Sequence, residues 1–138
     1  LYRLLVETLA RLCQPINPDL AARYYEVRLL DFVGFRPQLA QCAACGREIQ
    51  PQDQYFSAQQ GGALCPACGK KDTDSRPVAM QALKYLRHFQ RSSYAEARKV
   101  KPAENTLREM ESLMQDYITY LLERRLNTTT FLKQVKEN

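Results

Sequence analysis

The sequence predicts a mainly α-helical protein: a helical bundle domain that carries an inserted four-cysteine module with a short β-hairpin. Apolar residues recur at intervals of three and four over most of the chain, which is the period of amphipathic helices. Between residues 35 and 75 this period stops, and Pro, Gly, Gln and Asp become frequent. Two Cys-x-x-Cys pairs lie within the interruption. We therefore expect residues 1–40 and 71–138 to form the helical domain and residues 41–70 to form the inserted module.

Two helices are expected before the interruption. One face of the first, over residues 1–13, carries five leucines: Leu1, Leu4, Leu5, Leu9 and Leu12. The prolines of QPINPD end this helix, because a proline inside a helix removes a backbone hydrogen bond. Asn17 before Pro18 is typical of an N-cap followed by a first-turn proline, and Gly34 is typical of a helix end. The second helix should run from about Pro18 to Val33.

The stretch DQYFSAQQGGALC is expected to form two short strands, around residues 55–58 and 63–65. Gly61 and Gly62 should form the turn between them. No G-x-G-x-x-G or G-K-[ST] pattern accompanies these glycines, so a hairpin explains them better than a phosphate-binding loop does.

Helical periodicity resumes at about Pro77, where Val78, Ala82, Leu86 and Phe89 share one face. Ser93 is followed three residues later by Glu96, a capping-box pattern that predicts a short helix.

The longest helix should begin near Lys101 and Pro102 and end near Asn127, and the tail beyond it could add a turn or two. Arg124 and Arg125 would then lie at the end of a helix, where cations complement the helix dipole.

The cysteine spacing C-x2-C-x19-C-x2-C falls in the range that is typical of zinc sites. Each two-residue gap places both sulfur atoms on one side of a tight turn, and two such turns supply four thiolates to a tetrahedral ion. Gly46 and Gly69 each follow a pair, which suits the left-handed backbone of such turns. We expect one structural Zn²⁺ ion, because four thiolates leave no open position for catalysis. Its ligands should be Cys42, Cys45, Cys65 and Cys68.

Disulfide and redox roles for the cysteines are less favoured than a metal site. Disulfides are rare in the cytoplasm, and the fifth cysteine, Cys13, would be left over; it is most simply a small buried hydrophobic residue. A redox dithiol would need a strand followed by a helix at the motif, and neither pair shows that context in the sequence. The module holds few large apolar residues, so the metal must supply folding energy that a core of its own would not.

The composition limits the possible functions. Hydrophobic residues make up 45% and charged residues 25% of the chain, which is ordinary for a globular protein. No apolar run is long enough for a membrane helix and no signal peptide is recognisable, so we expect a cytoplasmic location without membrane contact. The single histidine, His88, has no nucleophile in a recognisable motif with it. We expect no enzymatic activity.

The formal net charge is +5, and the excess of basic residues lies in residues 76–138. Five of these residues cluster around one expected turn: Arg87, Arg91, Arg98, Lys99 and Lys101. They could form an ordinary solvated surface, or they could contact the phosphates of DNA or an acidic peptide.

Several stretches together resemble the C-terminal region of RecO, a family of bacterial recombination mediators and DNA repair proteins. They are YYEVRLLDFVGFRPQLAQCAACG, FSAQQGGALCPAC and YITYLLERRLNTTTFL, and the resemblance covers nearly the whole chain. It implies an N-terminal oligonucleotide-binding barrel, which would lie upstream and is absent from this chain, followed by a helical domain with a zinc module. The metal role of the family carries over to the four cysteines.

The resemblance also implies partners and a location: single- and double-stranded DNA, the protein RecR, and the acidic C-terminal tail of single-stranded DNA-binding protein, at the bacterial nucleoid during repair. Strand annealing and RecA loading are the activities of the family. We therefore expect a non-catalytic domain of a recombination mediator. The alternatives are a zinc-stabilised interaction module of transcription or translation and, less favoured, a redox dithiol protein.

Overall fold

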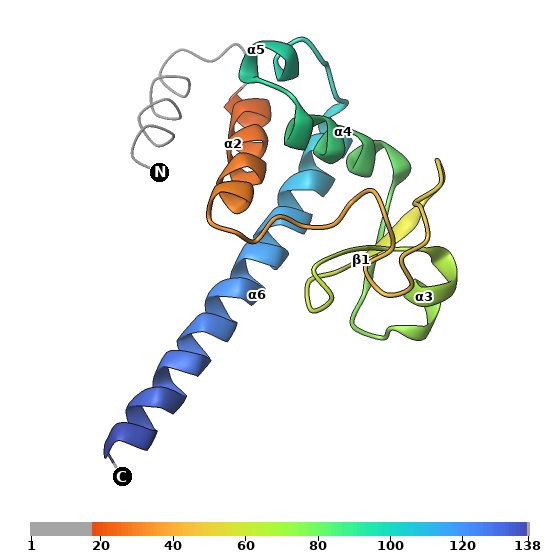
Figure 1. Cartoon of the computed structure of the whole chain (residues 1–138). Helices are drawn as coiled ribbons and strands as arrows, with labels where there is room; N and C mark the ends of the chain where they lie inside the picture. Colours follow the sequence, from red (N-terminus) through yellow and green to blue (C-terminus); the bar gives the residue numbers. More distant parts are fainter. Residues whose placement is uncertain (1–17, 138) are drawn as a thin grey trace.

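The computed structural model describes the backbone of residues 18–137 and the side chains of residues 18–124. The expected first helix and Cys13 lie outside the described residues. Helices predominate, and they accompany one small three-stranded antiparallel sheet (Figure 1). Of the helices in residues 18–137, none combines the length and the apolar character that a membrane span requires.

Helix α2 spans Pro18–Phe32, which confirms the expected start and places the end within one residue of the expected one. Local signals fix both ends. Pro18 supplies the helical φ of a first turn. At the other end Gly34 has a φ of +89°, and the N–H of Phe35 donates to the carbonyl of Leu30 at 2.8 Å. This arrangement is a Schellman motif, in which a glycine reverses the backbone and closes the last turn.

The sheet has the strand order β2-β1-β3 and is antiparallel throughout. Strands β1 (Gln54–Ser57) and β2 (Gly62–Leu64) confirm the expected hairpin. Strand β3 (Arg76–Val78) pairs with the free edge of β1 and was not expected. The expectation that a helix resumes at about Pro77 was therefore wrong. The sheet takes this strand from outside residues 41–70.

Two helices follow, α4 (Met80–Arg91) and α5 (Tyr94–Ala97). Helix α4 begins three residues after the expected start, and α5 begins directly after the expected cap. The Ser93 hydroxyl oxygen accepts a hydrogen bond from the backbone N–H of Glu96 at 3.4 Å, which confirms the expected N-cap. Such a bond satisfies one of the N–H groups that a helix start leaves without a partner.

Helix α6 spans Glu104–Glu137, so it begins later and continues further than expected. It projects well beyond the other elements (Figure 1). The expected end near Asn127 was wrong, because the backbone continues in helical conformation for ten more residues. Arg124 therefore lies in the middle of the helix sequence and not in its last turn. The expected role of this residue as a cation that complements the helix dipole was wrong.

One contiguous core joins the helices to the sheet. Helices α2, α4 and α6 contact one another in pairs, and Phe89, Leu86 and Leu113 are fully buried between them. Phe56 and Leu64, on the two strands of the hairpin, belong to the same cluster of buried side chains. The module therefore shares its core with the helical domain.

Tyr117 connects three parts of the chain. Its hydroxyl donates a hydrogen bond to the carbonyl oxygen of Phe35 at 3.0 Å, and its ring meets that of Phe56 edge to face with 5.5 Å between centroids. Helix α6 is thereby fixed both to the loop after α2 and to β1. Burial raises the pKa of the Tyr117 hydroxyl, which stays protonated as the donor.

Replacing Tyr117 with Phe is expected to lower the free energy of unfolding by about 1 kcal/mol, because the ring contact stays while the Phe35 carbonyl loses its donor. Urea unfolding of the two proteins, followed by circular dichroism, measures the difference. An unchanged midpoint would show that this hydrogen bond contributes nothing to the junction.

Candidate metal centre

Cys42 and Cys45 lie on a tight turn that closes on itself. The N–H of Cys42 donates to the carbonyl of Arg47 at 2.7 Å, and the N–H of Gly46 donates to the carbonyl of Cys42 at 2.9 Å. The N–H of Cys45 approaches the Cys42 Sγ at 3.5 Å. Gly46 has a φ of +80°, so the expected left-handed position is confirmed here. Both sulfur atoms consequently lie on one side of the turn.

Cys65 and Cys68 are positioned differently from what the sequence suggested. Cys65 directly follows β2 and is the N-cap residue of a short helix, α3 (Pro66–Lys71), that was not expected. The expectation that neither pair has a strand followed by a helix was therefore wrong for this pair. The N–H of Gly69 donates to the carbonyl of Cys65 at 2.8 Å, which closes the turn around the pair.

Gly69 does not have the left-handed backbone that we expected, because its φ is not positive. Close packing explains this glycine instead. A Cβ atom at residue 69 would lie 2.3 Å from two ring carbons of Tyr55, so only a residue without a side chain lets α3 lie against β1.

The four sulfur atoms converge. All of them lie within 4.8 Å of one another, and the Sγ atoms of Cys45 and Cys65 are 3.8 Å apart. In a tetrahedral zinc site with bonds of about 2.3 Å, neighbouring sulfur atoms are about 3.8 Å apart. A disulfide would need about 2.05 Å, and the four thiols are free. The donor set and its spacing therefore fit a zinc ion.

The two halves of the cluster are also joined through the backbone. The N–H of Ala43 donates to the carbonyl of Ala63 at 2.8 Å, so the first turn is held against β2. Cys42 is buried, Cys45 is exposed, and the other two cysteines are half-buried. The cluster therefore lies near the surface, with Cys42 on its buried side.

The thiol groups affect one another's ionisation. Burial acts to raise the pKa of Cys42, but backbone hydrogen bonds, first that of Cys45, outweigh it and lower the pKa to about 6. The pKa of Cys68 is raised to about 12, chiefly by its hydrogen bond with the side chain of Cys65, with the Cys42 charge acting in the same direction. Four neighbouring thiolates need a cation among them, and a divalent metal supplies it.

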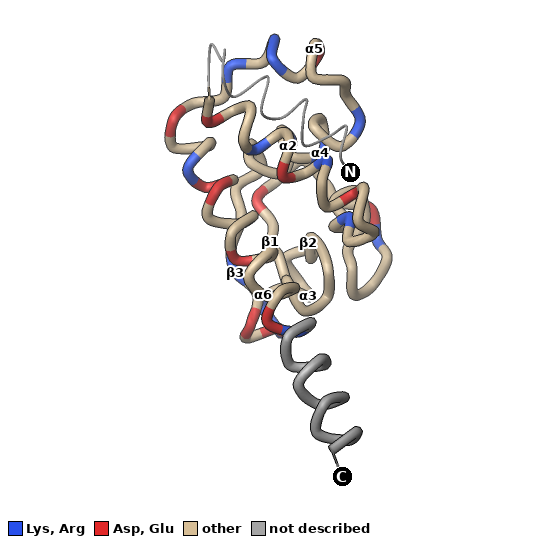
Figure 2. The backbone as a smooth tube through the Cα atoms, turned by 90° about the vertical axis from the view of Figure 1, so that its left-hand side faces the viewer, with Lys and Arg blue, Asp and Glu red and all other residues tan. Residues whose placement is uncertain are grey.

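Of the five basic residues that the sequence singled out, Arg87 and Arg91 lie on α4. Arg98 is the C-cap residue of α5, and Lys99 and Lys101 follow it in the segment that leads to α6. Figure 2 shows basic positions at the α5 end of the molecule. Arg87 is half-buried, whereas the other four are exposed. Lys99 forms an ion pair with Glu96 at 3.4 Å, which is weak because both side chains are exposed to water.

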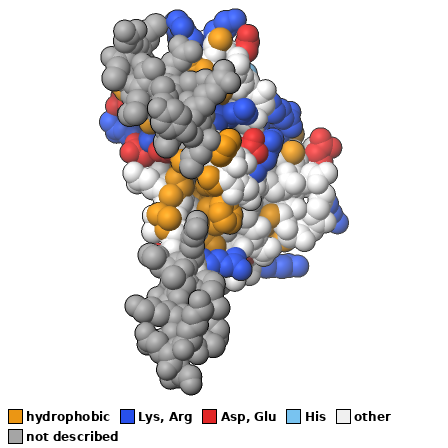
Figure 3. All heavy atoms as spheres, turned by 60° about the vertical axis from the view of Figure 1, so that its left-hand side comes forward, with side chains coloured by type: hydrophobic (Ala, Val, Ile, Leu, Met, Phe, Trp, Pro, Cys, Tyr) orange, Lys and Arg blue, Asp and Glu red, His pale blue; other side chains and the backbone are white. Residues whose placement is uncertain are grey.

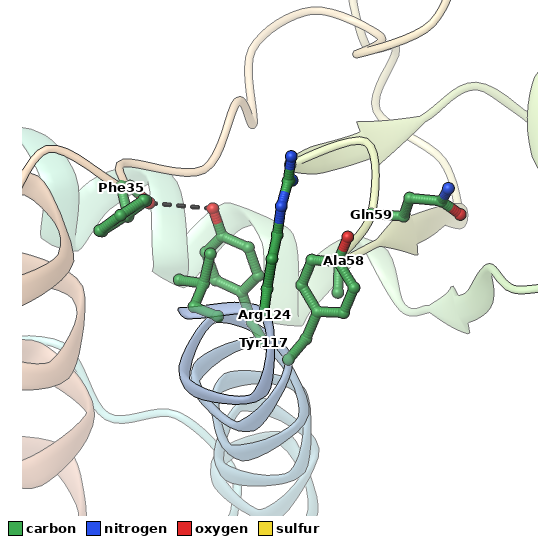
Figure 4. Close-up of a pocket in the computed structure, with 8 residues that line it drawn as sticks. Phe35, Ala58, Gln59, Tyr117 and Arg124 are labelled. Atoms are coloured by element: carbon green, nitrogen blue, oxygen red, sulfur yellow. Dashed lines mark hydrogen bonds between the residues drawn. The ribbon is translucent and has the colours of Figure 1, made fainter. Parts of the chain in front are cut away.

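The structure also brings together residues that sequence reasoning did not select. A hollow of about 470 Å³ lies between α6, the loop after α2 and the turn of the hairpin. Its walls include Phe35, Tyr117, Tyr120 and Arg124, and Figure 4 shows Arg124 projecting from α6 toward the hairpin turn. The only signal in the sequence was the helical spacing of Tyr117, Tyr120 and Arg124, which is equally typical of a helix that packs on a core.

Hydrophobic side chains are exposed near this region. Phe32, Val33, Phe35 and Leu122 are each at least 46% exposed. In Figure 3 hydrophobic side chains gather in one strip on the molecular surface, with basic side chains at its lower end. Exposed aromatic residues beside cations are typical of a surface that binds a partner.

Comparisons with known proteins identify one family that matches this chain over most of its length. The family model described as "Recombination protein O C terminal" matches residues 1–130. The DNA repair protein RecO of Roseiflexus sp. (strain RS-1) is 37% identical over 136 residues, which cover 99% of this chain and 48% of that protein. The DNA repair protein RecO of Dehalococcoides mccartyi (strain ATCC BAA-2100) is 30% identical, with 99% and 53% covered. The chain spans about half the length of these curated relatives.

Proposed function

The chain belongs to the RecO family, and on that premise we propose that it is the non-catalytic C-terminal domain of a recombination mediator in DNA repair. The match of the family model to residues 1–130 is the observation that carries this proposal. The names of the relatives support a role in DNA repair. The domain would act in the bacterial cytoplasm, at the nucleoid, and would contribute to DNA binding, strand annealing and RecA loading.

One Zn²⁺ ion is proposed to stabilise the module, with the four converging cysteines as its ligands. The bound ion would neutralise the thiolates and join the turn at Cys42 to the start of α3. With all four positions occupied by sulfur, the ion would have no coordination site for a substrate. Its role would be to fix the geometry of the surface around the sheet.

The partners that we propose are single- and double-stranded DNA, RecR, and the acidic tail of single-stranded DNA-binding protein. Basic side chains on the domain would attract DNA and the acidic tail, because phosphates and carboxylates are both anions. The proposed contact surface consists of the five basic residues at the α5 end of the molecule: Arg87, Arg91, Arg98, Lys99 and Lys101.

Reversing the charge of each of these five residues singly to Glu is expected to weaken binding to duplex DNA. Each lost phosphate contact should also reduce the slope of log affinity against log salt by about 0.9. Fluorescence anisotropy at several salt concentrations measures both quantities.

Arg108→Glu is the matched control, because Arg108 is 75% exposed on α6 and the substitution changes the charge by the same amount. The surface is inert toward DNA if the five variants bind no more weakly than this control. The acidic tail peptide, titrated against the same proteins, distinguishes a protein-binding surface from a DNA-binding one.

The redox alternative gains one supporting observation, since Cys65 follows a strand and caps a helix. The close approach of all four sulfur atoms favours the metal. Reversible formation of a Cys65–Cys68 disulfide in zinc-loaded protein would instead support the redox function.

A further inference from the structure

The hollow beside α6 combines aromatic rings with one cation. Phe35 contributes a ring that is 46% exposed, Tyr120 is half-buried, and Tyr117 lines the interior while only 3% exposed. Leu121 completes the apolar part, and Arg124 supplies a guanidinium group. The volume of about 470 Å³ falls in the range of roughly 300–1,000 Å³ that is typical of pockets for small ligands.

We propose that this hollow binds one unstacked base of single-stranded nucleic acid, while Arg124 contacts a phosphate next to that base. The inference rests on the proposed function, because it names the ligand and the place of one DNA contact. Single-strand binding proteins hold bases on aromatic side chains and the backbone on cations, and this hollow offers both.

The charge of the walls favours a nucleotide over an acidic peptide. The residues that line the hollow include one cation, Arg124, and no carboxylate. One guanidinium group matches one phosphate, whereas a peptide with several carboxylates would need several cations in its groove. Aromatic rings from two separate segments, the loop after α2 and helix α6, add flat faces on which any base can stack.

The position of Arg124 fits a contact with a phosphate at the edge of the hollow. Helix α6 continues past this residue to Glu137, so Arg124 does not serve as a cation at a helix end. It is exposed, and in Figure 4 it projects toward the turn that carries Ala58 and Gln59. A cation at the edge of an aromatic hollow is placed where the sugar-phosphate backbone of a bound DNA strand would pass.

The test compares Tyr120→Ala with the wild-type zinc-loaded chain at low salt. The probe is an oligothymidylate of about 12 nucleotides, within the site sizes of about 4–16 that single-strand binding modules use. Two further probes are a duplex of equal length and an oligomer of equal length that has abasic sites in place of thymidine.

We expect Tyr120→Ala to weaken oligothymidylate binding roughly 5- to 100-fold, in line with the loss of one stacked base. Affinity for the abasic oligomer and for the duplex should not change. Tyr120→Phe, which keeps the ring, should bind like the wild type. Arg124→Ala should reduce the salt slope for single strands by about 0.7, whereas Arg108→Ala on the exposed face of the same helix should leave it unchanged.

Three results would overturn the inference. The first is an unchanged affinity of Tyr120→Ala for oligothymidylate, and the second is an equal loss of affinity for the abasic oligomer. The third is that Tyr120→Ala loses affinity for a short acidic peptide ending in Phe but keeps its affinity for oligothymidylate. The third result would assign the hollow to a protein partner. If the wild-type chain bound none of the DNA probes, the proposed DNA contact would fail as well. Circular dichroism and zinc content of each variant show that the fold is retained.

Discussion

Chelation of zinc is expected to abolish ordered structure in residues 41–70 while most of the helical circular-dichroism signal remains. The sheet is too small to be stable alone, since its pairings involve only three residues each. Metal binding contributes about 10–16 kcal/mol to the folding of comparable zinc peptides. Although Cys42 belongs to the shared core, α2, α4 and α6 also pack directly on one another, so these helices keep the surface that they bury against each other.

Cys65→Ser should have the same effect, because it removes one of four ligands and part of the bridge between the two turns. Elemental analysis should give one zinc per chain for the wild type and much less for Cys65→Ser in the presence of a competing chelator. Cys13→Ser is the matched control, since it makes the same change outside the motif and should keep the zinc. A Cys65→Ser protein that retains one zinc with undiminished affinity would refute the four-cysteine site.

Gly62→Ala is expected to destabilise the protein by at least about 3 kcal/mol, at the upper end of what overpacking costs. A Cβ atom at residue 62 would lie 2.2 Å from the carbonyl oxygen and 2.8 Å from the nitrogen of Gln38. These are backbone atoms, so no side chain can rotate away. Gln38 also forms a parallel bridge with Gly62, and its carbonyl accepts the N–H of Ala63 at 2.7 Å. The substitution should separate the segment after α2 from the hairpin.

Gly61→Ala provides the comparison at the neighbouring residue. Gly61 has a φ of +81°, but a Cβ atom at residue 61 would meet no other atom within 4 Å, so only backbone strain of roughly 1–2 kcal/mol is expected. Thermal and urea unfolding of both variants measure the two costs. Equal losses at residues 61 and 62 would show that strain at the turn, and not the contact with Gln38, determines the need for glycine.

The sequence predicted the features that depend on neighbouring residues. Pro18 and Gly34 set the limits of α2, and Ser93 caps α5. Gly61 lies in the hairpin turn as expected, whereas Gly62 was wrongly expected there and begins β2. The cysteine cluster was predictable for the same reason, because each pair is a local turn and the ion prefers a known number of sulfur ligands.

Features that depend on distant residues were not predictable in this way. Strand β3 has three residues, one of them Pro77, and exists because β1 offers a free edge. The reason for Gly69 lies in the ring of Tyr55, which is fourteen positions away in the chain. The hollow takes its walls from three separate segments. The end of α6 was missed because Thr128, Thr129 and Thr130 are weak helix formers, yet the helix continues through them.

The hairpin turn that forms one wall of the hollow is also the link between the two strands next to the metal centre. Loss of zinc would therefore also open the hollow, because the hairpin turn that forms its wall would come away from α6. On the proposal that the hollow binds a base, zinc content and affinity for single-stranded DNA would decrease together, although none of the four clustered cysteines lines the hollow.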